Sequence, residues 1–146
     1  MITLIYADAS YDAKRQVAGL GVVISRHAHF ENTKTKRYKR LVQSNDSNLA
    51  ELQAVYLATL QLTEKDNNII IMTDNTNVRQ TIRRPTREEY AGDRCELGLL
   101  IRKELEKYPD RRFRVYHVEG HSLSTDQHSV NQQICDKIAN DVRKGR

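Results

Sequence analysis

The chain has 146 residues with a formal net charge of +5, and 38% of the residues are hydrophobic. This length suits a single domain over residues 1–146 with its own core. No apolar run approaches the roughly 18 residues of a membrane span and no secretory signal opens the chain, so we expect a cytoplasmic protein without membrane association.

The first predicted element is a strand over residues 3–10, TLIYADAS, with apolar side chains on both faces. Such a strand belongs in the middle of a sheet that is covered on both sides. The apolar run ends on Asp8, which shares a face with Leu4 and Tyr6. Because a carboxylate at the edge of a core is costly unless it is paired, hydrogen-bonded or bound to a metal, Asp8 is a candidate functional residue.

Two further strands are predicted over residues 18–25 and about 36–43. Gly19 and Gly21 in the second strand indicate that another backbone approaches it closely. The third segment, TKTKRYKRL, gathers five basic residues around Tyr38, which is typical of a lysine-guarded edge strand or of a surface for a polyanion. We expect the three strands to form an antiparallel meander.

Helices and strands alternate in the rest of the chain. Helices are predicted over residues 48–62, 75–82, 94–107 and about 130–142, and strands over residues 67–74 and 112–118. Asn48 is the expected N-cap of the first helix, with Glu51 in a capping-box position. This order predicts an α/β fold with a five-stranded mixed sheet, in which strands 1–3 are antiparallel and helices cover both faces.

Four acidic residues lie at the ends or first turns of core elements, or beside an apolar helix stripe: Asp8, Glu51, Asp74 and Asp136. Alone, each has an ordinary explanation, namely a buried ion pair, a capping box, a helix cap and a solvated surface position, in that order. If the strands that precede Asp8 and Asp74 are parallel neighbours, their carboxylates meet at one edge of the sheet. A cluster of acids repels itself unless cations bind, and hard divalent ions such as Mg²⁺ take oxygen ligands.

Taken in order, these residues resemble the type 1 ribonuclease H family. The matching segments are IYADAS with Asp8, NLAELQAV with Glu51, IIMTDN with Asp74, CDKIA with Asp136, and VEGH with His121 in the family's Gly-His loop. The resemblance covers nearly the whole chain. It implies an RNase H-like fold, with strands 4 and 5 parallel to strand 1. It also implies an endonuclease that cuts the RNA strand of an RNA/DNA hybrid, leaving 3′-hydroxyl and 5′-phosphate ends.

The resemblance also implies a role for each matching residue. The four carboxylates would hold two Mg²⁺ ions, with Mn²⁺ as a possible substitute; one ion would activate the attacking water and the other would stabilise the leaving 3′-oxygen. His121 would assist proton transfer or product release. The expected partner is an RNA/DNA hybrid, and the protein is expected to be a monomer without an N-terminal hybrid-binding domain.

Contacts to the nucleic acid follow from the same resemblance. Asn48 resembles a family position that contacts the RNA 2′-hydroxyl, since an amide can both donate and accept a hydrogen bond. The basic segments would neutralise the backbone without sequence preference. The remaining expected contacts to sugar or phosphate are Ser47, Asn75, Thr76, Arg83, Arg84 and Arg87.

The chain departs from the family's pattern in two places. Many bacterial relatives carry a tryptophan-containing basic protrusion, but this chain has no Trp and the corresponding region, residues 83–93, is short. The stretch from His121 to Asp136 is longer than is typical, and Asn131 lies one residue further from Asp136 than the family's usual Asn. These departures concern hybrid affinity and the geometry of the His121 loop.

Two alternatives stay open. The first is a DNA-directed nuclease or resolvase of the same fold, which Asn48 and VEGH disfavour. The second is a non-catalytic nucleic-acid-binding module, which the retention of all four acids disfavours. A transposase or integrase would need further domains that 146 residues do not hold.

Overall fold

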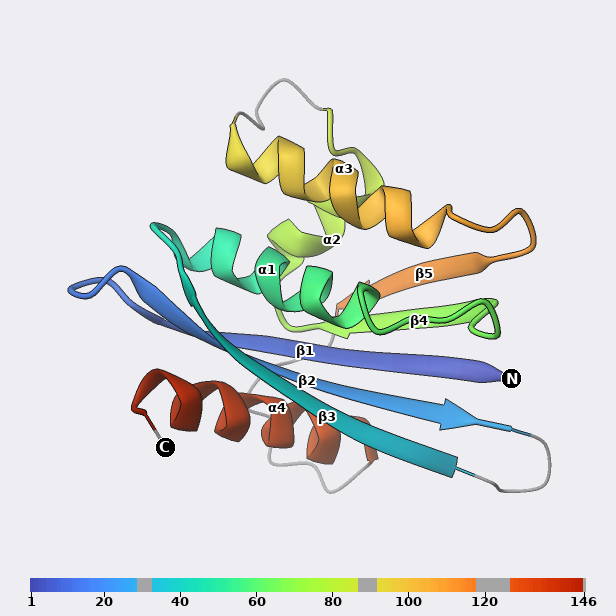
Figure 1. Ribbon diagram of the computed structural model, residues 1–146, viewed down its shortest axis with the longest axis horizontal. Coiled ribbons are helices and arrows are strands. Elements are labelled where there is room, and N and C mark those ends of the chain that lie inside the picture. The colour runs from blue at the N-terminus through green and yellow to red at the C-terminus, as the bar shows by residue number, and fades with distance from the viewer. Residues whose placement is uncertain (29–32, 87–91, 118–126, 146) are drawn as a thin grey trace.

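The computed structural model contains a five-stranded sheet with helices on both faces (Figure 1). The structure describes residues 1–28, 33–86, 92–117 and 127–145. No helix within these ranges is long and apolar enough to cross a membrane. The elements are β1 (Ile2–Asp12), β2 (Val17–His27), β3 (Thr33–Gln43), α1 (Ser47–Thr59), β4 (Asn68–Thr73), α2 (Thr76–Arg83), α3 (Asp93–Leu105), β5 (Arg112–His117) and α4 (Gln127–Arg143).

The sheet has the strand order β3-β2-β1-β4-β5. β1, β2 and β3 pair antiparallel, whereas β4 pairs parallel with both β1 and β5. The predicted α/β fold with a mixed five-stranded sheet is therefore confirmed. β1 is central and buried on both faces: Ile5 packs in the core beneath α1, and Tyr6 packs in a second core beside Cys135 of α4.

α1 lies between the sheet and α3, so it is buried around most of its circumference (Figure 1). The predicted N-cap, Asn48, is wrong: Asp46 is the N-cap, and its side chain accepts a hydrogen bond from Leu49 N at 3.2 Å, so Asn48 lies within the first turn of the helix. Glu51 is consequently the fifth helical residue. The capping-box explanation of Glu51 is therefore wrong, and its carboxylate is left for another role.

β1 does not end at the apolar run that predicted it. It continues past Asp8 to Asp12, because residues 8–12 pair with residues 17–21 of β2 in a long hairpin. Only the parallel ladder with β4 ends early, at the pair of Tyr6 and Met72. α4 likewise begins at Gln127 rather than near residue 130, since its first turn is polar and carries no apolar signal.

α4 lies directly against the backbone of β2, as the two glycines predicted. A Cβ atom built on Gly21 would lie 2.3 Å from the carbonyl oxygen of Cys135, and one on Gly19 would lie 2.1 Å from that of Ala139. Only glycine allows this approach. The contact fixes the height of α4 over the sheet, and with it the position of Asp136, the residue after Cys135.

We expect Gly21→Ala to destabilise the protein by about 3 kcal/mol, because the new methyl group overlaps a backbone atom that cannot rotate away. Gly98→Ala is the matched control, since the two nearest atoms to its Cβ would be side-chain atoms of Pro85 and Thr81, at 2.9 and 3.0 Å, and the nearest backbone atom, the carbonyl oxygen of Thr81, would be 3.4 Å away. Urea unfolding measures both free energies. Equal losses in the two variants would contradict the close packing of α4 on β2.

Candidate metal centre and active site

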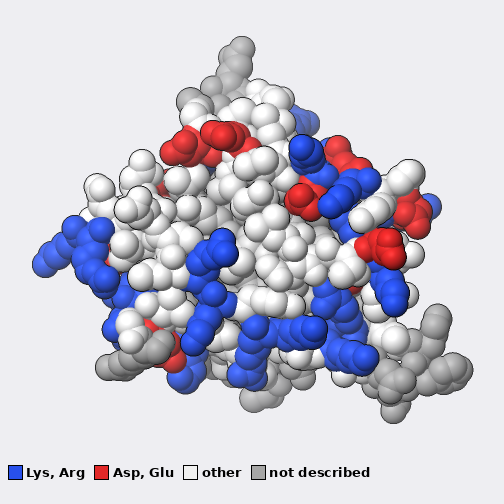
Figure 2. Space-filling model, viewed as in Figure 1, with Lys and Arg blue, Asp and Glu red and all other residues white. Residues whose placement is uncertain are grey.

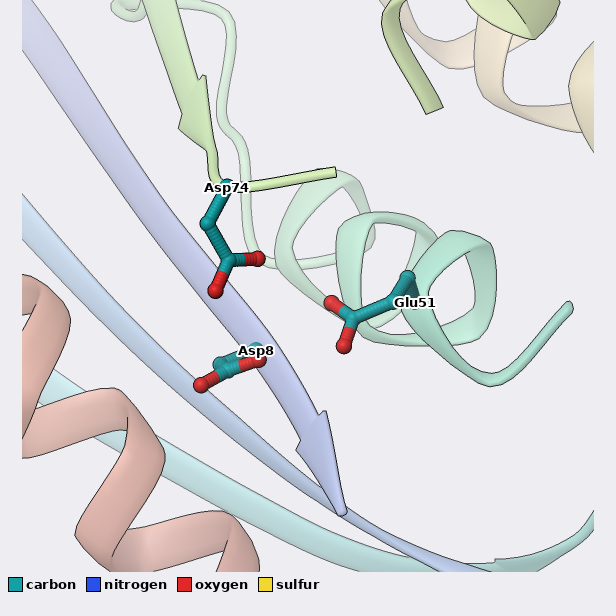
Figure 3. Close-up of side chains that lie close together, drawn as sticks. All are labelled: Asp8, Glu51 and Asp74. Atoms are coloured by element: carbon teal, nitrogen blue, oxygen red, sulfur yellow. The ribbon is translucent and has the colours of Figure 1, made fainter. Parts of the chain in front are cut away.

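Three carboxylates from three elements converge at one edge of the sheet. Asp8 lies in β1, Asp74 directly follows β4, and Glu51 projects from α1. One carboxylate oxygen from each residue lies within 4.8 Å of the other two, and Figure 3 shows the three side chains pointing toward a common space. The sequence prediction that Asp8 and Asp74 meet is confirmed.

The register of the parallel strands explains this meeting. Tyr6 pairs with Met72 at the end of the β1–β4 ladder. Asp8 and Asp74 each follow that pair by two residues, so both lie just beyond the last paired position on neighbouring strands. Carboxyl ends of parallel strands are where open α/β sheets form their sites.

The backbone of Ala9 links Asp8 to Glu51. Its N–H donates to Asp8 Oδ1 at 2.9 Å and also lies 3.3 Å from Glu51 Oε1. The other oxygen of Glu51, Oε2, is buried and has no hydrogen-bond partner. A buried carboxylate oxygen without a donor is costly, and a cation is one group that removes the cost.

Burial and neighbouring charges raise the pKa values of Asp8 and Glu51. Burial raises the pKa of Asp8 to about 7, and the charge of Asp74 adds to this effect. Burial, with smaller contributions from the charges of Asp8 and Asp74, raises the pKa of Glu51 to about 10. At neutral pH and without a cation, the Glu51 carboxyl therefore keeps its proton and the Asp8 carboxyl keeps part of one.

Asp66 shows how the same protein stabilises a buried acid without a metal. Asp66 is fully buried and accepts hydrogen bonds from Thr3 Oγ1 at 2.6 Å and from Arg26 Nε at 2.9 Å. Burial raises its pKa, but the hydrogen bonds from Arg26 and Thr3 outweigh burial and hold the pKa below its ordinary value. Within the described residues, no Lys or Arg pairs with Asp8 or Glu51. A group of carboxylate oxygens without a basic partner fits a hard divalent cation.

Asp136 lies on α4, outside the close group of three carboxylates. It is half-buried, and its charge is the smallest of the causes that raise the pKa of Asp8. His121 and Arg87 lie outside the described residues.

The predicted nucleic-acid contacts fall into two groups. Asn48 and Asn75 lie together, since Asn75 Nδ2 donates to Asn48 Oδ1 at 3.0 Å. Asn75 is also the N-cap of α2, so the explanation of Asp74 as that helix's cap is wrong. The other candidates are exposed at helix ends, two at the starts of α1 and α2 and two at the end of α2: Ser47, Thr76, Arg83 and Arg84.

A basic surface runs along β3. This strand is at the edge of the sheet, and five of its residues are exposed Lys or Arg side chains: Lys34, Lys36, Arg37, Lys39 and Arg40. Figure 2 shows Lys and Arg gathered over the lower part of one face, where β3 and α4 lie in Figure 1. The expected edge strand is confirmed.

Sequence reasoning missed two polar residues beside the site. Gln132 is buried, and its Nε2 donates to the carbonyl oxygen of Ala7 at 3.3 Å. Asn77 Nδ2 lies 3.4 Å from Asn48 Oδ1. The signal for Gln132 was its position four residues before Asp136, which places both on one side of a helix. Asn77 gave no comparable signal.

Comparisons with known proteins agree with this geometry. A family model described as RNase H matches residues 2–144. The N-terminal RNase H domain of rv2228c from Mycobacterium tuberculosis superposes with a TM-score of 0.75 at 16% identity, covering 99% of this chain and 94% of that one. RNase H1 from the halophilic archaeon Halobacterium salinarum NRC-1 gives 0.71 at 14% identity, covering 100% of both chains.

A longer protein contains the same fold as one part. The protease-reverse transcriptase of prototype foamy virus gives a TM-score of 0.74 at 18% identity over 95% of this chain, which spans 20% of that protein. At these identities the likeness shows the fold. Among curated protein sequences, no match is found.

We expect the metal-free protein to lose stability as the pH rises. The folded-state pKa values of Asp8 and Glu51 lie above their ordinary values of 3.8 and 4.5, so the folded state binds more protons than the unfolded state. The loss extends from about pH 4 to about 7 for Asp8 and to about 10 for Glu51. Asp74→Asn removes a charge that raises the pKa values of both Asp8 and Glu51. We expect this variant to be about 1 kcal/mol more stable than the wild type at pH 8, and its stability to depend less steeply on pH.

Thermal unfolding in the presence of a chelator, from pH 5 to pH 9, measures this dependence. The matched control is Asp110→Asn, which removes an exposed carboxylate. A stability that does not fall with pH, or an Asp74→Asn variant that is less stable than the wild type, would contradict the electrostatic coupling of the three acids.

Proposed function

The chain belongs to the RNase H family, and from this we propose that it is an endonuclease that cuts the RNA strand of RNA/DNA hybrids, leaving 3′-hydroxyl and 5′-phosphate ends. The proposal rests on the convergence of Asp8, Glu51 and Asp74 at the sheet edge of a chain that matches the family from residue 2 to residue 144. Solved proteins that share this fold and are named as RNase H or as an RNase H domain also support it.

Asp8, Glu51 and Asp74 would hold divalent ions, with Asp136 completing the set from α4. We infer Mg²⁺, with Mn²⁺ as a substitute, because all the donors are hard oxygens. Bound in a pair, such ions supply an activated water and a stabilised leaving 3′-oxygen.

The chain's own residues prepare this site. Ala9 N–H orients Asp8 and Glu51 by contacting an oxygen of each. The Glu51 carboxyl has to give up its proton before both of its oxygens can bind a cation, because burial keeps it protonated at neutral pH. His121, on its Gly-His loop, would carry a proton to or from the reacting phosphate or help the product leave.

The substrate would lie across the starts of α1 and α2. Asn48 is three residues before Glu51 and shares its side of α1, so its amide is on the site's side of the helix. The basic edge of β3 would neutralise backbone charge without reading sequence. Sugar and phosphate contacts would come from Ser47, Asn75, Thr76, Arg83, Arg84 and Arg87.

Cleavage of an end-labelled RNA/DNA hybrid with Mg²⁺ or Mn²⁺ tests the proposal. We expect the hybrid's RNA strand to be cut and duplex DNA and duplex RNA to remain intact. Asp74→Asn should lower the rate at least about 100-fold, because it removes a ligand and a charge at the reacting centre. Since this variant is expected to be stable, unfolding would not explain the loss.

Asp110→Asn is again the control and should cut at the wild-type rate. A hybrid left intact with both metals would contradict the proposed activity. Cleavage of duplex DNA instead would favour the DNA-directed alternative, and an Asp74→Asn variant as active as the wild type would contradict the role of the carboxylates.

A further inference from the structure

The direction of the hydrogen bonds between Asn75 and Asn48 is set by the backbone of α2. Two backbone N–H groups, of Asn77 and Val78, lie 2.8 and 3.3 Å from Asn75 Oδ1. A backbone N–H can only donate, so the atom that faces them has to be the amide oxygen. The amide of Asn75 therefore has one allowed orientation.

That orientation passes to Asn48. With its oxygen capping α2, Asn75 presents its NH₂ group to Asn48, which must offer an oxygen at the 3.0 Å contact. Asn77 Nδ2 lies 3.4 Å from the same oxygen and is consistent with this orientation. The Oδ1 atom of Asn48 is thus occupied inside the protein.

Only the NH₂ group of Asn48 then remains for a ligand. Within the described residues, no acceptor receives a hydrogen bond from Asn48 Nδ2. Asn48 is half-buried and lies on the Glu51 side of α1. Its two N–H donors are therefore available beside the carboxylates.

We propose that Asn75 is a positioning residue that makes Asn48 a donor only, so that Asn48 reads a substrate 2′-oxygen as an acceptor. This inference rests on the proposed function and deepens it. It replaces the expectation that the Asn48 amide both donates and accepts. A 2′-substituent that accepts weakly but cannot donate, such as fluorine, is then tolerated better than hydrogen, which does neither.

The inference predicts a change of preference when the amide is inverted. Asn75→Asp keeps the cap of α2, because Asp caps helices as well as Asn does, but a carboxylate cannot donate to Asn48. The Asn48 amide should rotate, donate to the new carboxylate and present its oxygen outward. Asn48→Asp also presents only oxygen and should give the same preference without a change at Asn75.

The experiment uses RNA/DNA hybrids in which one RNA 2′-hydroxyl at a time, near the cut, is replaced by fluorine or by hydrogen. In the wild type, there should be one nucleotide at which replacing the 2′-hydroxyl by hydrogen lowers kcat/KM about five- to tenfold, whereas replacing it by fluorine lowers kcat/KM less than about threefold. In Asn75→Asp and in Asn48→Asp, the kcat/KM for the fluorine-substituted hybrid should fall to that for the hydrogen-substituted hybrid. The ratio of fluorine to hydrogen within each variant cancels any general loss of activity.

Gln80→Glu is the matched control, since it makes the same amide-to-carboxylate change on the exposed face of α2. It should keep the wild-type ratio. The inference is overturned if Asn75→Asp and Asn48→Asp keep that ratio too, or if the wild type treats fluorine and hydrogen alike at every position.

Equilibrium binding of the same hybrids without divalent ions, by fluorescence anisotropy, gives the ratio independently of cleavage. If the wild type binds but cuts none of the hybrids, the proposed activity fails while the binding ratio still tests Asn48. If the wild type cuts the hybrid and the ratios do not change, the inference alone fails.

Discussion

Repulsion among three partly buried carboxylates is the constraint on which the site depends. Asp8, Glu51 and Asp74 are held within 4.8 Å of one another by a parallel strand pair and a packed helix, none of which can move apart without disrupting the core. Burial, together with this repulsion, raises the pKa of Asp8 to about 7 and that of Glu51 to about 10. The fold thus maintains an arrangement that is unfavourable in itself and that divalent cations would stabilise.

The surrounding packing serves the same arrangement. Glycines in β2 let α4 lie on the sheet and bring Asp136 toward Asp8. At the opposite end of β1, near Thr3, the buried Asp66 is paired with Arg26 and needs no metal. The two buried acids differ in their partners rather than in their burial. This contrast favours a binding role for Asp8 and a structural role for Asp66.

The sequence predicted the sheet, its order of elements and the meeting of Asp8 with Asp74, because these follow from apolar periodicity and parallel pairing. It did not predict where α1 begins, since Asp46 and Asn48 are both good caps and only tertiary packing decides between them. The orientation of the Asn48 amide was also beyond it, because that depends on hydrogen bonds between residues 27 positions apart. Patterns along the chain indicate periodicity, whereas the orientation of a side-chain amide is set by contacts in space.

Proton release on Mg²⁺ binding tests the central claim most directly. Titration calorimetry at pH 7 in buffers of different ionisation enthalpy counts the protons that leave when the ion binds. Because Glu51 and part of the Asp8 population are protonated beforehand, the account predicts the release of at least about one proton. Binding without proton release would show that the carboxylates are already ionised, and would contradict the claim that burial and mutual repulsion define the site.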